Sequence, residues 1–129
     1  MEYLLSNKKY FFGIMILLFS YCQNQYRGIT DKRLIGFLSS NNIDSIMEGN
    51  YIASKNKRKD MVCLILKEPY DSRISHNIKY KGMSVYQSKI SALRNISGLN
   101  TSQKITYKVD STIVAFYYKW AIENDLVEN

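Results

Sequence analysis

The chain has 129 residues, a formal net charge of +7 at pH 7 and an apolar fraction of 46%, which is typical of a folded domain. Its single histidine and two cysteines exclude a multi-histidine metal site and a disulfide-rich scaffold. With an N-terminal segment of 21 residues set aside, 108 residues (129 − 21) remain, enough for one domain with a modest core.

The first 21 residues have the layout of a secretory signal. Lys8 and Lys9 form a positive start, and residues 10–21 (YFFGIMILLFSY) are uncharged and mostly apolar. This run of 12 residues is shorter than the ~20 apolar residues that a membrane-spanning helix needs. We therefore expect a signal segment at 1–21, a short polar tether at 22–30 and a single domain at 31–129.

Cys22 lies where the apolar run ends. This arrangement resembles the processing site of bacterial lipoproteins, in which the cysteine becomes the lipidated N-terminus of the mature chain. Ser20 fits that pattern, whereas Phe19 and Tyr21 depart from it. The resemblance implies lipidation at Cys22 and attachment to a membrane of the cell envelope. An uncleaved signal anchor, or cleavage a few residues later followed by secretion, is the alternative.

Positive charge dominates the chain that follows the signal segment. Without Glu2, Lys8 and Lys9 the formal charge falls from +7 to +6, which favours anionic partners such as an acidic surface. We expect the densest basic cluster to be a solvated turn between helices, rather than a site for phosphate or acidic lipid. No aromatic residue is interleaved in it, so nucleic acid is not favoured as a partner. The cluster consists of Lys55, Lys57, Arg58 and Lys59.

Two helices are predicted before that cluster. Thr30 or Asp31 begins the first, over 31–39, whose apolar residues share one face. Asn42 caps the second, which extends to the basic cluster and has apolar residues at spacings of three and four. Gly49 lowers helix stability there, and the usual compensation is the close approach of a neighbouring helix.

A third helix is predicted after the basic cluster. Asp60 begins it, residues 62–66 supply its apolar face and Pro69 ends it. Cys63 lies on that face and is left alone if Cys22 carries lipid. We therefore expect Cys63 to be a buried, inert thiol, and we expect no disulfide to hold the fold together.

The apolar pattern of residues 33–38 (RLIGFL) recurs 28 residues later at 61–66 (MVCLIL). Residues 66–74 and 91–98 resemble the turn and second helix of a HEAT-type repeat, in which a proline ends one helix and an Ala-Leu pair closes the next before a glycine. The resemblance implies an α-solenoid of antiparallel helix pairs, a class that mostly binds other macromolecules. The matching residues are Asp71, Arg73, Ile74, Ala92, Leu93, Ile96 and Gly98.

Residues 75–82 (SHNIKYKG) lengthen the second unit of this pattern. We expect a loop there, with the helix restarting at Ser84 through a capping box with Gln87 and ending at Gly98. Loops added to a repeat commonly carry its contacts, so this insertion is the predicted binding surface. The candidate binding residues are Arg73, His76, Lys79, Tyr80 and Lys81.

The C-terminal part is predicted to be a linker at 99–109 and a last helix over 111–124 that begins at Asp110 or Ser111. Its apolar residues cover much of its circumference, so we expect it to close the open end of the stack. Three aromatic residues on it have two interpretations, as core or as a partner groove. They are Tyr117, Tyr118 and Trp120.

The sequence contains no phosphate-binding loop, paired metal-ligand spacing or nucleophile elbow. Asp44 and Glu48 lie four residues apart, a spacing of like charges that predicts solvent exposure. The expectation is an all-α domain of about five helices that acts as an exported interaction module. Its expected partner is an envelope protein or an anionic surface, with no catalytic residue, cofactor or metal. The alternative is a small envelope enzyme or thiol protein that uses Cys63 or His76.

Overall fold

The computed structural model describes residues 29–129, and the signal segment, Cys22 and most of the tether lie outside them. In the described part the prediction of an all-α fold with about five helices is confirmed. A single antiparallel bridge between Ile74 and Ser84 is the one β-type pairing there. The five helices are α3 (Ile29–Leu38), α4 (Ile43–Lys55), α5 (Val62–Ile65), α6 (Val85–Ser97) and α7 (Ser111–Glu123), with two 3₁₀ turns, η1 (Lys59–Met61) and η2 (Ile78–Tyr80).

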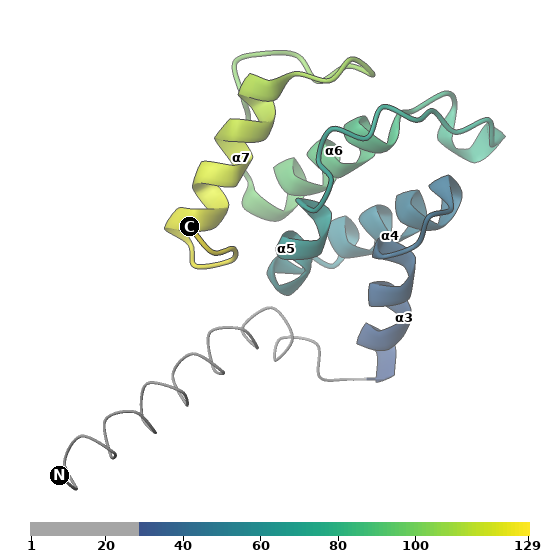
Figure 1. Cartoon of the computed structure of the whole chain (residues 1–129), viewed down its shortest axis with the longest axis horizontal. Coiled ribbons are helices and arrows are strands. Elements are labelled where there is room, and N and C mark those ends of the chain that lie inside the picture. Colours follow the sequence, from purple (N-terminus) through teal and green to yellow (C-terminus); the bar gives the residue numbers. More distant parts are fainter. Residues whose placement is uncertain (1–28) are drawn as a thin grey trace, which may run out of the picture.

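Helix α6 lies at the centre of the arrangement (Figure 1). It packs against α4, α5 and α7, and α3 packs on α4 and α5. Eight of the thirteen residues of α6 are buried, and two of these eight, Ser88 and Lys89, are polar. The chain between α5 and α6 runs along α6 and returns through η2 to the start of that helix.

The core consists of two clusters of buried side chains. The larger one joins all five helices, with Ala53 as its member from α4, and its largest fully buried members include Tyr86, Tyr117 and Met61. The smaller one lies where α4 meets the start of α6 and comprises Ile46, Met47 and Val85. Burial of this apolar surface supplies the main stabilisation of the helices, which would be marginal alone.

Three predicted helix starts are confirmed by their capping hydrogen bonds. Asn42 Oδ1 accepts from the Ser45 amide at 3.0 Å, and Ser84 Oγ accepts from the Gln87 amide at 3.0 Å. Asp110 caps α7 by accepting from the amide of residue 112 at 2.9 Å. Gly98 ends α6 with a φ of 72°, the left-handed conformation that glycine adopts without steric cost.

The predicted starts of the first and third helices are wrong. Helix α3 already begins at Ile29, so Asp31 lies inside its first turn and is not its cap. The third helix is preceded by η1 and has a single α-helical turn, α5. Asp60 does not cap it, because its carboxylate instead accepts hydrogen bonds from Arg58.

Two pairs of residues that lie 28 positions apart in the sequence are buried at both positions. Leu34 and Leu38 of α3 are buried, as are their counterparts Val62 and Leu66. Beyond Leu66 no α-helix forms until Val85, and Ile74, the counterpart of a buried residue of α4, is 40% exposed. Within this segment residues 75–82 form an ordered loop containing η2, as predicted.

Gly49 allows α3 and α4 to approach closely, which confirms the expected compensation. A Cβ atom at position 49 would lie 3.0 Å from side-chain atoms of both Leu38 and Phe37. Gly36 lies on the exposed side of α3, where an added Cβ meets nothing within 4 Å.

The two glycines should therefore respond in opposite directions to alanine. Gly36→Ala should raise the free energy of unfolding by about 0.5–1 kcal/mol through helix propensity. Gly49→Ala gains the same propensity but forces α3 away, and it should lower that free energy by about 1–2 kcal/mol. Urea unfolding followed by circular dichroism measures both. If Gly49→Ala raised the free energy of unfolding, α3 and α4 could move apart without losing stability, and the role given to Gly49 would be wrong.

Candidate functional site

The segment between α5 and α6 is tied to the start of α6. The Val85 and Tyr86 amides donate to the carbonyls of Arg73 and Asp71 at 2.8 and 2.7 Å. The Arg73 guanidinium donates to Asp71 Oδ2 at 2.7 Å and to the Asn41 carbonyl at 2.9 Å. This hydrogen bonding holds the pKa of Asp71 below its usual range. Arg73 therefore connects this segment to the turn before α4.

Two acidic residues of α4, Asp44 and Glu48, hold the loop of residues 75–82 against that helix. The prediction that these two residues are exposed to solvent is wrong. Both carboxylates are half-buried. Asp44 accepts a hydrogen bond from Ser75 Oγ at 2.6 Å. Glu48 accepts from Lys79 Nζ at 2.6 Å and from the Tyr80 hydroxyl at 2.9 Å. The hydrogen bond from Lys79 holds the pKa of Glu48 below its usual value.

The five candidate binding residues therefore fall into two groups. Arg73, Lys79 and Tyr80 make hydrogen bonds to acidic groups of the same chain. His76 and Lys81 are exposed and have neither an ion pair nor a side-chain hydrogen bond in residues 29–129. The insertion is thus held to α4 by Ser75, Lys79 and Tyr80, and of its two lysines only Lys79 is paired with an acid.

Cys63 differs from the thiol expected from the sequence. It is half-buried and disulfide-bonded. A sulfur in a disulfide has no thiolate and cannot act as a nucleophile or general base. The chain has one other cysteine, Cys22, which lies outside the described residues.

Arg58 departs from the expectation of a solvated cation. Its guanidinium donates to Asp31 Oδ1 at 2.6 Å and, through Nε, to Asp60 Oδ1 at 2.8 Å. These two carboxylates raise the pKa of Arg58, with the hydrogen bond to Asp60 the larger cause. Arg58 thus joins the start of α3 to η1, and its charge is satisfied inside the protein.

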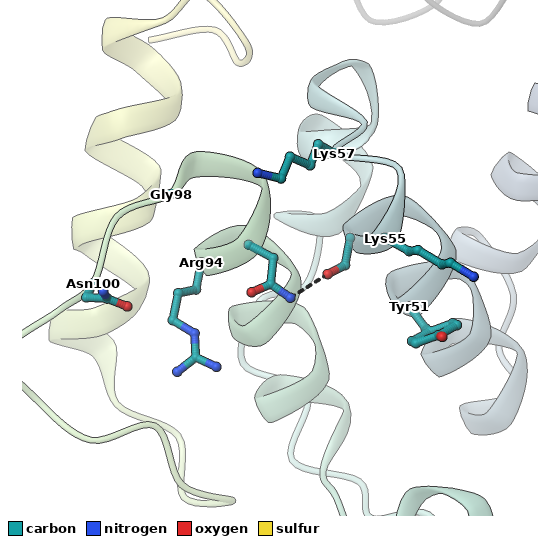
Figure 2. Close-up of a pocket in the computed structure, with 8 residues that line it drawn as sticks. Tyr51, Lys55, Lys57, Arg94, Gly98 and Asn100 are labelled. Carbon is teal, nitrogen blue, oxygen red and sulfur yellow. Dashed lines mark hydrogen bonds between the residues drawn. The ribbon is translucent and has the colours of Figure 1, made fainter.

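Two other members of the basic cluster line a hollow at the C-terminal ends of α4 and α6 (Figure 2). We name it the basic hollow. It has a volume of about 550 Å³, and three of its lining residues are cations while none is acidic. Its lining consists of Tyr51, Ser54, Lys55, Lys57, Arg94, Asn95, Gly98 and Asn100.

The cations of the basic hollow have no acidic partner among residues 29–129. Lys55, Lys57 and Arg94 are exposed, and none forms an ion pair within the part of the chain that the structure describes. Figure 2 shows Lys57 reaching from the end of α4 toward the end of α6, with Lys55 and Arg94 pointing away to either side. The three charges therefore spread across the surface and do not converge on one point.

The floor of the basic hollow is held by a hydrogen bond between its two helices. Asn95 Nδ2 of α6 donates to Ser54 Oγ of α4 at 2.8 Å (Figure 2). Sequence reasoning missed Arg94 and Asn95, because they are distant in the chain from the basic cluster. The signal that could have found Arg94 is its place in the last turn before Gly98, at the same end of its helix as Lys55 in α4.

A second feature that sequence reasoning missed is the buried cation Lys89. Its Nζ donates to the Lys67 and Glu68 carbonyls at 2.6 and 3.2 Å, just beyond the end of α5. Burial lowers the pKa of Lys89. The Lys89 ammonium donates hydrogen bonds to backbone carbonyls that the short helix α5 leaves unpaired. Its role here is therefore structural.

No family model matches this chain, and no curated protein or solved structure matches it either. None of the helices between residues 29 and 129 has the length and apolar character needed to span a membrane.

Proposed function

We propose that this protein is an exported helical module that binds a macromolecule carrying several negative charges, and that the basic hollow is its binding surface. The observation that carries the proposal is the gathering of three exposed cations and no acid around one hollow. Elsewhere Arg58, Arg73 and Lys79 are neutralised by acids of the same chain. The cations of the basic hollow form no ion pair with residues 29–129, and they differ from other exposed lysines such as Lys104 and Lys108 in lining one hollow together.

The spread of the three cations favours an extended polyanion over one small anion. A site for a single phosphate or carboxylate needs donors that converge on it, as in bidentate arginine pairs. Lys55 and Arg94 also lie in the last turns of their helices, where a cation offsets the helix dipole. Offsetting the two helix dipoles needs only Lys55 and Arg94, one cation for each helix. Lys57 is a third cation that this structural role does not explain.

The binding proposal is tested by removing these charges. Replacing Lys55, Lys57 and Arg94 together by Gln should weaken binding to immobilised polyglutamate about tenfold, since each exposed charge contributes a fraction of a kcal/mol. The matched control replaces Lys32, Lys104 and Lys108 by Gln, which removes the same charge from exposed positions outside the basic hollow. Salt-dependent retention on the polyanion column measures both variants. Equal losses in the two would reduce the proposal to a general effect of net charge.

Export is the second part of the proposal. It is supported by the charged start and apolar run of residues 1–21, and by the disulfide at Cys63, because disulfides persist in oxidising compartments outside the cytosol. Lipid attachment at Cys22 is the competing arrangement, since a disulfide within the chain and a thioether to lipid would need the same Cys22 sulfur.

Alkylation of the exported chain separates these two arrangements. We expect iodoacetamide to leave Cys63 unmodified under denaturing, non-reducing conditions and to modify it after dithiothreitol, as mass spectrometry of the peptide would show. Labelling with an alkyne fatty acid, with Cys22→Ala as control, is the complementary measurement. A Cys63 that reacts without reduction, in a chain that takes up the fatty acid at Cys22, would establish the lipoprotein arrangement instead.

A further inference from the structure

The disulfide at Cys63 lies on α5, the shortest of the five α-helices in the part of the chain that the structure describes. This helix has four residues, Cys63 is the second of them, and its side chain is half-buried. A helix of one turn has little stability of its own and depends on contacts outside it. A segment that is not part of the core can reach a half-buried position. The disulfide is therefore placed where it can fix α5 to another part of the chain.

Noncovalent contacts hold the chain on both sides of α5. Beyond its C-terminal end, the Lys89 ammonium donates to the Lys67 and Glu68 carbonyls. Ahead of its start, Arg58 donates at 2.6 Å to Asp31, which lies in the first turn of α3. Arg58 directly precedes η1, which leads into α5, and α3 also packs on α5. The first turn of α3 therefore lies close to the start of α5.

The tether is long enough to bring Cys22 to this place. Cys22 precedes Ile29, the first residue of α3, by seven positions (29 − 22). Seven extended residues span roughly 24 Å. On the other side, Cys63 follows Arg58 by five positions through η1 and α5, a rise of roughly 10 Å in helical conformation. The tether can therefore place Cys22 against Cys63, with the two Cα atoms about 4–7 Å apart as a disulfide requires.

We infer that Cys63 is bonded to Cys22, and that the bond closes a ring of 42 residues (63 − 22 + 1) around α3 and α4. The chain has only these two cysteines, and Cys63 is not free. Cys22 then belongs to the folded domain, so any cleavage of the signal segment must lie ahead of it. The inference rests on the export part of the proposed function and is independent of polyanion binding.

Formation of the bond needs an electron acceptor. Two thiols release two protons and two electrons, and the acceptor we name is the disulfide of an exported oxidoreductase, which becomes a dithiol. The thiolate of Cys22 or Cys63 attacks that disulfide and forms a mixed disulfide, and the second thiolate then displaces the oxidoreductase. This exchange follows export, because the cytosol keeps thiols reduced.

A peptide map of the exported chain under non-reducing conditions identifies the partner of Cys63. Trypsin leaves Cys63 in fragment 60–67 and Cys22 in a fragment that ends at Arg27. We expect one species in which the two fragments are joined, with a mass two hydrogens below their sum, and we expect it to disappear after dithiothreitol.

Three results of this map would overturn the inference. Fragment 60–67 joined to a second copy of itself, or to another protein, would leave export supported while the pairing with Cys22 falls. The same fragment recovered as a thiol would remove both the pairing and the support that the disulfide gives to export. None of these results bears on polyanion binding by the basic hollow.

Urea unfolding of the exported chain tests whether the bond closes the ring. The ring restricts the unfolded chain, so Cys22→Ser should raise the equilibrium constant for unfolding about a hundredfold. Cys63→Ser removes the same bond, so the double variant should be little worse than either single one. Gln23→Ser is the matched control in the tether and should have no such effect.

Dithiothreitol supplies the decisive comparison between the same proteins. It should destabilise the wild-type chain and Gln23→Ser to the level of Cys22→Ser, because reduction opens the ring in both. It should leave Cys22→Ser unchanged, because that variant has no ring to open. If Cys22→Ser is as stable as the wild-type chain without the reductant, or if dithiothreitol still destabilises it, the partner of Cys63 is not Cys22 and the inference is wrong.

Discussion

Tyr117→Ala is expected to lower the free energy of unfolding by about 3–5 kcal/mol, the range found for removing a large buried aromatic side chain. The ring of Tyr117 is fully buried in the larger core cluster, which joins all five helices. Its hydroxyl donates to the Leu99 carbonyl at 2.9 Å, which fastens the linker after α6 to α7. A domain of this size has a total stability of roughly 5–15 kcal/mol, so this loss would remove a large share of it.

Two control variants separate the parts of that effect. Tyr117→Phe keeps the ring and removes the hydrogen bond to Leu99, and it should cost about 1 kcal/mol. Tyr118→Ala removes a side chain that is 40% exposed, and its effect should stay within about 1 kcal/mol. Urea unfolding of all three gives the comparison. A larger loss for Tyr118→Ala than for Tyr117→Ala would mean that α7 packs through a different face.

Arg58→Ala is expected to lower the free energy of unfolding by about 2–3 kcal/mol. The substitution removes the cation between Asp31 and Asp60, whose side chains are 14% and 27% exposed. The two carboxylates would then lose their hydrogen bonds and face each other partly desolvated, which is costlier than losing an exposed ion pair.

The shape of the Arg58 side chain gives the matched control. Arg58→Lys keeps the charge but lacks the planar fork that donates to both carboxylates, so it should recover only part of the loss. Lys59→Ala, at an exposed neighbouring position without an ion pair among the described residues, should change stability by less than about 0.5 kcal/mol. Equal effects at positions 58 and 59 would contradict the role given to Arg58.

Much of the fold was predictable because capping residues act locally. Asn42, Ser84 and Asp110 begin helices by accepting backbone hydrogen bonds from residues two or three positions ahead, so short sequence patterns identify them. The start of α3 and the shortness of α5 were not predictable this way. Asp31 and Asp60 are of a residue type that often caps helices, but here their carboxylates accept hydrogen bonds from Arg58. This tertiary contact replaces the local capping hydrogen bond.

The functional surface was harder to predict, because pairing of charges depends on elements distant in the chain. Lys79 and Arg73 looked available, yet acids on α4 and in the same segment neutralise them. Three members of the basic cluster, Lys55, Lys57 and Lys59, are exposed as predicted, but the sequence did not indicate that α6 adds Arg94 beside them. Lys89 was detectable in part, since it lies three residues after Tyr86 and four before Leu93, on the buried face of α6.

The most direct test of the central claim maps where a polyanion binds. A ¹⁵N-labelled sample of the exported chain is titrated with polyglutamate, and amide chemical shifts are followed by NMR. We predict that the largest changes fall on the ends of α4 and α6, at residues 51–57 and 94–100, and that they vanish when Lys55, Lys57 and Arg94 are replaced by Gln. Changes centred instead on residues 73–81, or spread evenly over all exposed lysines, would contradict the assignment of the basic hollow as the binding surface.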